Sequence, residues 1–163
     1  MTDKKGNLYS TYNPDSKWDW YCVGGRWSDM LKLKSGGYAD EARLGDIDFS
    51  PDAEEYENAL HFWKVYVEDE DPDGEDTDRF IYKREYYKEF YRDAETYAKS
   101  VSGFSTHSVL TPDGMWHEIG EMGWFGISGE TPEESMAWHD GYYDGFIKDE
   151  DPNLIMTIVD CHI

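Results

Sequence analysis

The side chains best suited to bind a ligand lie in one aromatic, glycine-rich segment, residues 18–27. Gly24 and Gly25 precede Arg26, whose guanidinium offers five donors in a planar fork. Arginine beside aromatic rings suits nucleotides, phosphates or carboxylates. Arg26 could equally pair with one of the chain's many acids and fill a gap between rings, and both interpretations stay open. The side chains predicted to build a small-molecule site are Trp18, Trp20, Arg26, Trp27, His117 and Trp124.

Cysteine and histidine side chains form a second, weaker group of candidates. The possible metal ligands are Cys22, His107, Cys161 and His162, but no CxxC or HxxxH spacing joins them. No metal site is favoured, and no cofactor is predicted. A cysteine nucleophile oriented by Asp160 would need an electropositive setting, and residues 103–163 hold twelve acids and one base. The catalytic residues therefore stay unknown, and an enzyme is not the favoured class.

The chain carries 36 Asp and Glu against 15 Lys and Arg, a formal net charge of −21. Residues 1–35 are slightly basic at +2, so the rest carries −23. Such a field repels the phosphates of DNA and RNA. Residues 68–78 are the densest run, and a solvated loop is favoured over a calcium site because no closing bidentate glutamate follows. Its acids, taken as candidates for an acidic surface, are Glu68, Asp69, Glu70, Asp71, Asp73, Glu75, Asp76 and Asp78.

These candidates must be positioned by a chain of 163 residues, enough for one domain. Residues 1–16 are polar and turn-rich and predict an irregular arm. We expect residues 17–163 to form one α+β domain, with a mostly antiparallel sheet, two to three packed helices, and the acidic loop at 68–78. The near-continuous apolar run at 154–159 predicts a central C-terminal strand covered on both faces.

Local signals predict the other elements. Residues 17–23 favour a strand that ends in a glycine turn. Helices are expected from Ser50-Pro51 toward Val67, over residues 84–102, and from the capping sequence at Thr131 to about Ile147. The aromatic stripe of the middle helix is typical of a core. Residues 104–110 and 115–118 flank a Thr-Pro-Asp-Gly turn and predict a β-hairpin.

The sequence also limits where the protein can reside. No stretch approaches the roughly 20 apolar residues of a membrane span, and no apolar secretory core follows the first residues. Two cysteines are too few for a disulfide-stapled secreted scaffold. The expectation is therefore a cytoplasmic protein that contacts neither membrane nor nucleic acid directly.

Several motifs spread along the chain resemble those of one family. Residues 13–21 (NPDSKWDWY) run into residues 24–27 (GGRW), and residues 111–117 (TPDGMWH), 120–126 (GEMGWFG) and 159–163 (VDCHI) follow. Together they resemble an uncharacterised family of hypothetical proteins from bacteriophages, prophages and bacteria. The resemblance implies an accessory protein that acts on host machinery, in the cytoplasm of the host cell, and it implies no particular activity.

Two hypotheses follow from these observations. The first is a phage-type acidic accessory protein that binds and inhibits a host protein, such as one of anti-phage defence, by mimicking nucleic acid at a basic surface. The alternative is a protein that sequesters or hydrolyses a nucleotide or another small molecule at the segment around Arg26. A third explanation, that the charge serves only solubility, stays open.

Overall fold

The structure is a computed structural model that describes residue 18 and residues 20–68, 83–120 and 129–162. The chain divides into two compact units, each described here by itself. Unit 1 comprises Met1–Asp48 and Pro152–Ile163, and unit 2 comprises Phe49–Asp151. The predicted arm, residues 1–16, lies outside the described residues. The prediction of one domain over residues 17–163 stays a prediction.

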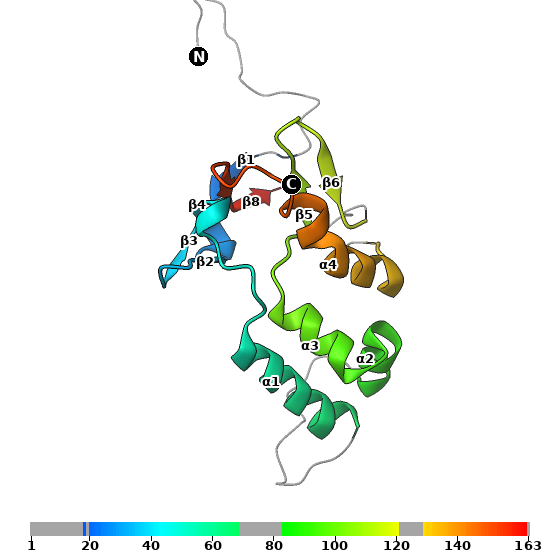
Figure 1. The fold of residues 1–163 in the computed structure, drawn as a ribbon. Helices are drawn as coiled ribbons and strands as arrows, with labels where there is room; N and C mark the ends of the chain where they lie inside the picture. The colour runs from blue at the N-terminus through cyan, green and yellow to red at the C-terminus, as the bar shows by residue number, and fades with distance from the viewer. Residues whose placement is uncertain (1–17, 19, 69–82, 121–128, 163) are drawn as a thin grey trace, which may run out of the picture. The chain divides into compact units, whose positions relative to one another are not determined.

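The described residues have an α+β fold, with four α-helices and four two-stranded antiparallel sheets (Figure 1). The small sheets replace the larger antiparallel sheet that we expected. In the described part of the chain each strand has one partner strand, and every strand is two to four residues long. No described helix is long and apolar enough to cross a membrane.

Unit 1 is built from short strands that come from both ends of the sequence. Figure 1 shows the last strand, β8, beside the first, β1. The core of the unit contains Leu31, Ile47 and Ile158, each at most 4% exposed. The elements are β1 (Trp20–Val23), η1 (Gly25–Trp27, a 3-10 helix), β2 (Leu31–Lys32), β3 (Tyr38–Ala39), β4 (Glu41–Arg43), η2 (Leu44–Asp46, a 3-10 helix), β7 (Ile155–Thr157) and β8 (Val159–His162).

The apolar run at 154–159 belongs to unit 1, but it is not the single central strand that we predicted. It is divided at Ile158, whose N–H donates to the carbonyl of Asp40 at 2.8 Å and whose carbonyl accepts from the N–H of Gly24 at 2.9 Å. The two halves have different partners: β7 pairs with β4 and β8 pairs with β1. Ile155 is 58% and Val159 40% exposed, so the run is not covered on both faces.

Unit 2 contains the four α-helices and one hairpin. The helix α1 packs against α3, and Phe62 of α1 and Tyr97 of α3 form an aromatic cluster with Trp63, the residue after α1. The predicted hairpin is confirmed, with Val109 opposite His117. The elements are α1 (Ala53–Phe62), η3 (Trp63–Val67, a π-helix), α2 (Arg84–Tyr91), α3 (Ala94–Ser102), β5 (Ser108–Leu110), β6 (Trp116–Glu118) and α4 (Pro132–Phe146).

The helix predicted over residues 84–102 is two helices, and this raises the number of α-helices above the two to three expected. The break lies at Arg92, which adopts a φ of 70°, and at Asp93, whose carboxylate accepts the N–H of Thr96 at 2.8 Å. Asp93 therefore caps a new helix instead of continuing the old one. The aromatic stripe forms ring contacts, with the centroids of Tyr91 and Tyr97 5.0 Å apart across the break, but its rings are not buried: Ala98 is its only member in the core of the described residues, and Val101 is 43% exposed.

The two remaining helix starts follow local capping chemistry. Thr131 and Glu134 form the predicted capping box, and α4 then runs through Gly141 and Gly145 to Phe146. The helix α1 begins later than Ser50-Pro51 because Asp52 is the residue whose carboxylate accepts the first free N–H groups.

Candidate functional site

The glycine turn after β1 is held by two aspartates from other parts of unit 1. Asp160 of β8 accepts the backbone N–H of Arg26 at 3.0 Å, and Asp40 accepts the backbone N–H of Asp29 at 2.7 Å. Gly24 and Gly25 have φ values of 68° and 64°, which L side chains rarely adopt. A Cβ at Gly25 would lie 2.6 Å from the Cβ of Asp160. The turn thus needs glycine because of both its conformation and its packing.

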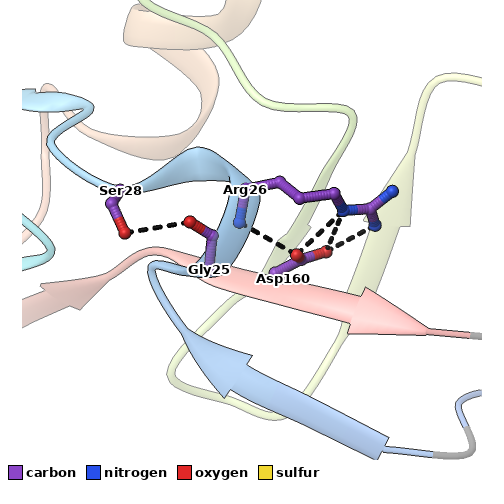
Figure 2. A network of polar contacts seen from close by, with 4 residues as sticks. All are labelled: Gly25, Arg26, Ser28 and Asp160. Carbon is purple, nitrogen blue, oxygen red and sulfur yellow. Dashed lines mark hydrogen bonds and ion pairs between the residues drawn. The ribbon is translucent and has the colours of Figure 1, made fainter.

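Arg26 is paired with Asp160 through its side chain as well. Its Nε lies 2.9 and 3.1 Å from the two carboxylate oxygens, and its Nη2 lies 2.5 Å from Oδ1 (Figure 2). Asp160 is 3% exposed, whereas the Arg26 side chain is 63% exposed. These hydrogen bonds lower the pKa of Asp160 to about 2. Arg26 therefore pairs with an acid of this chain, which is one part of the structural interpretation, and whether it also binds a ligand stays a prediction.

The register of β1 and β8 determines which side chains share a face with this pair. Directly opposed residues lie on the same face and successive residues alternate. Asp160 is opposite Cys22, and His162 is opposite Trp20. The rings of Trp20 and His162 are stacked, with centroids 4.5 Å apart and an interplanar angle of 10°. One face of the β1–β8 pair therefore carries an ion pair and an aromatic stack.

The two cysteines do not form a disulfide. Cys22 is opposite Asp160 while Cys161 is opposite Tyr21, so the thiols project from opposite faces of the pair. Burial, followed by the nearby charge of Asp160, raises the pKa of the Cys161 thiol. A protonated thiol is a poor nucleophile, so this shift opposes the activation of Cys161.

The candidate ligand residues fall into separate parts of the chain. Unit 1 contains four of them: Trp18, Trp20, Arg26 and Trp27. His117 belongs to unit 2, where the centroid of its ring lies 5.2 Å from that of Phe146. Trp124 lies outside the described residues. The six side chains proposed for a small-molecule site are therefore not brought together as one group within either unit.

The weak metal candidates are also divided between the units. Unit 1 contains Cys22 on β1 and both Cys161 and His162 on β8. His107 belongs to unit 2 and directly precedes β5. His107 Nδ1 is 2.9 Å from the hydroxyl of Ser108, and its buried Nε2 has no hydrogen-bond partner among the described residues. In the described ranges no three His, Cys, Asp or Glu side chains converge as metal ligands would.

A polar cluster that the sequence did not indicate joins α4 to the segment before β5. Ser105 Oγ and His139 Nδ1 lie 2.6 Å apart, and the hydroxyls of Thr106 and Tyr142 lie 2.7 Å apart. The indole of Trp138 donates to the carbonyl of Thr106 at 2.9 Å. Burial lowers the pKa of His139. Three side chains of α4 thus hydrogen-bond to residues 105 and 106, and no sequence motif predicts these contacts.

The negative charge is unequally divided between the two units. Unit 2 holds 27 acidic and 8 basic residues, a net charge of −19, whereas unit 1 holds 9 and 7, a net charge of −2. Glu68 ends η3 and accepts the indole N–H of Trp63 at 3.2 Å. The other acids of the predicted surface lie outside the described residues: Asp69, Glu70, Asp71, Asp73, Glu75, Asp76 and Asp78.

Comparison of the chain with protein-family models, with curated proteins and with solved structures gives no match.

Proposed function

We propose that this chain is a non-enzymatic accessory protein that binds a partner protein with a basic surface and keeps that surface from nucleic acid. The observation that carries the proposal is the concentration of charge: unit 2 has a net charge of −19. A surface of this sign attracts the Lys- and Arg-rich grooves that otherwise bind phosphates. The resemblance noted in the sequence implies that the partner is a host protein, such as one of anti-phage defence.

The described helices of unit 2 supply part of this charge at exposed positions. On α4, Glu133, Asp140 and Asp144 are exposed and share one side of the helix, since they are spaced by seven and four residues. Glu133 and Asp144 have basic neighbours in Arg92 and Lys148. Both ion pairs are exposed and contribute little to stability, and the net charge of −19 already includes the two cations.

The test is affinity capture from a bacterial lysate at low salt, followed by elution with a salt gradient. A variant with Asp140→Lys and Glu150→Lys changes the charge of unit 2, and a control with Glu41→Lys and Asp46→Lys makes the same change in unit 1. All four side chains are exposed. The proposal expects capture of proteins that handle nucleic acid, elution at lower salt for the unit 2 variant, and no such shift for the control.

A second measurement asks whether the bound surface is the one that holds nucleic acid. Each captured protein is mixed with a fluorescent DNA duplex, and the chain is titrated in. The expected result is release of the duplex, monitored by anisotropy. Failure to capture any nucleic-acid-handling protein at low salt, or capture without release of the duplex, would overturn the proposal.

A further inference from the structure

The face of the β1–β8 pair that carries Arg26 combines an aromatic platform with an oriented cation. Trp20 is 52% exposed and its stacking partner His162 is also exposed. Because the two rings stack on each other, they are already held parallel. They therefore lose little conformational freedom when a ligand ring stacks on them. Pre-ordered aromatic side chains of this kind are the usual support for a nucleobase, because every base has a π-face.

Asp160 orients the guanidinium of Arg26, but it does not occupy all of its hydrogen-bond donors. Asp160 binds Nε and Nη2 of Arg26, and this fixes the plane of the guanidinium. Figure 2 shows the third nitrogen, Nη1, pointing away from the carboxylate. Because the side chain is 63% exposed, donors on its outer edge can reach a ligand. A guanidinium already held by a buried carboxylate loses little freedom when it binds an anion.

The register of the strands sets the spacing between the aromatic stack and the carboxylate that binds Arg26. The pair Trp20–His162 lies two residues along the strands from the pair Cys22–Asp160, or about 7 Å at the rise of a β-strand. In a nucleotide, a ribose separates the base from the phosphate by a comparable length. A base on the rings could therefore have its phosphate near Asp160, whose partner Arg26 supplies the donors.

We propose that this face of unit 1, formed by Trp20, His162 and Arg26, is a binding site for a nucleoside monophosphate. A single phosphate suits a site with one guanidinium. Unit 1 has a net charge of −2 and unit 2 one of −19, so an anion bound to unit 1 meets little repulsion from that unit, and each further phosphate adds to its repulsion by the chain, whose net charge is −21. The proposal is independent of the partner proposed for unit 2.

Calorimetric titration with AMP is the direct test, with adenosine and ribose 5-phosphate as the two halves of the ligand. If the proposal is right, AMP binds more tightly than either adenosine or ribose 5-phosphate. ATP should bind more weakly than AMP at low salt. The difference between the two affinities should shrink as added salt screens the charge of the chain. No saturable binding of AMP at millimolar concentration, or ribose 5-phosphate binding as well as AMP, would overturn the site.

Substitutions locate the ligand on this face. Trp20→Leu is expected to weaken AMP binding by about tenfold or more, because a stacking partner is lost. Arg26→Lys keeps a cation beside Asp160 but removes the planar fork, and it should also weaken AMP while leaving adenosine unchanged. The matched control is Tyr38→Leu, an exposed aromatic on β3 (58% exposed), which should change nothing.

His162→Ala provides a second route to the same conclusion if Trp20→Leu proves unstable in thermal unfolding. It removes the other ring of the stack at the exposed end of β8, and AMP affinity should again fall. Equal effects of Trp20→Leu and Tyr38→Leu, or full AMP affinity in both Trp20→Leu and His162→Ala, would show that the ligand does not use this platform.

Discussion

Replacing Gly25 by alanine should destabilise unit 1 through two separable effects. The first is conformational: the φ of 64° costs an L residue about 1–2 kcal/mol. The second is steric, because the added Cβ would lie 2.6 Å from Cβ and 2.7 Å from Oδ2 of Asp160, and 2.8 Å from Sγ of Cys22. Overpacking of this kind typically costs about 1–3 kcal/mol. The expected loss is about 2–5 kcal/mol in total.

Gly37 provides the matched control within the same unit. It has a φ of 82°, but a Cβ there would have nothing within 4 Å. Gly37→Ala should therefore cost only the conformational part, about 1–2 kcal/mol. Urea unfolding monitored by tryptophan fluorescence measures both, and hydrogen exchange at the Arg26 amide reports whether its bond to Asp160 survives. If Gly25→Ala lost no more stability than Gly37→Ala, the packing of the turn against Asp160 would be wrong.

Three further predictions concern titration and hydrogen bonding. The pKa of Asp160 is lowered to about 2 from an ordinary 3.8, so the stability that its bonds to Arg26 provide is present above pH 3.8 and is lost as the pH falls toward 2; the urea midpoint should fall in this range, and Asp160→Asn should reduce the fall without removing it, because the pKa values of Asp93 and Glu134 are also lowered. Burial lowers the pKa of His139 from 6.5, so on acidification the unfolded chain binds this proton before the folded chain does, and the stability should decline as the pH falls below 6.5. A urea midpoint that stays constant below pH 6.5, or an equal decline in His139→Asn, would refute this prediction. Tyr142→Phe removes a buried hydroxyl that bonds Thr106 and should cost about 1 kcal/mol in urea unfolding, whereas Tyr143→Phe, at a residue 48% exposed, should cost almost nothing.

The sequence predicts best those features whose signals are local. The capping box at Thr131 and Glu134 and the turn of the hairpin depend on residues within a few positions of one another, and both are found as predicted. Asp93 carried an equally local capping signal, but the continuous aromatic periodicity on both sides of it concealed the break. Periodicity alone therefore overestimates the length of a helix that contains a good capping residue.

The candidate site depends on contacts that local signals cannot supply. The sequence indicated that Arg26 would either bind a ligand or pair with an acid, but with 36 acids available it could not select Asp160, 134 residues away. One usable signal was an aspartate directly after an apolar run, since a buried carboxylate needs a partner. The contacts of α4 with Ser105 and Thr106 join residues more than thirty positions apart and carry no such signal.

The division of unit 1 between the two ends of this sequence has a consequence for biosynthesis. Residues 49–151 are translated as one uninterrupted stretch, and every helix of unit 2 can form before the strands β7 and β8 exist. Arg26 and its glycine turn, by contrast, must wait for Asp160, a delay on the order of ten seconds at usual elongation rates. Throughout that interval the nascent chain presents β1 and β4 without their partner strands, so unit 1 is the part of a growing chain most exposed to chaperones and proteases.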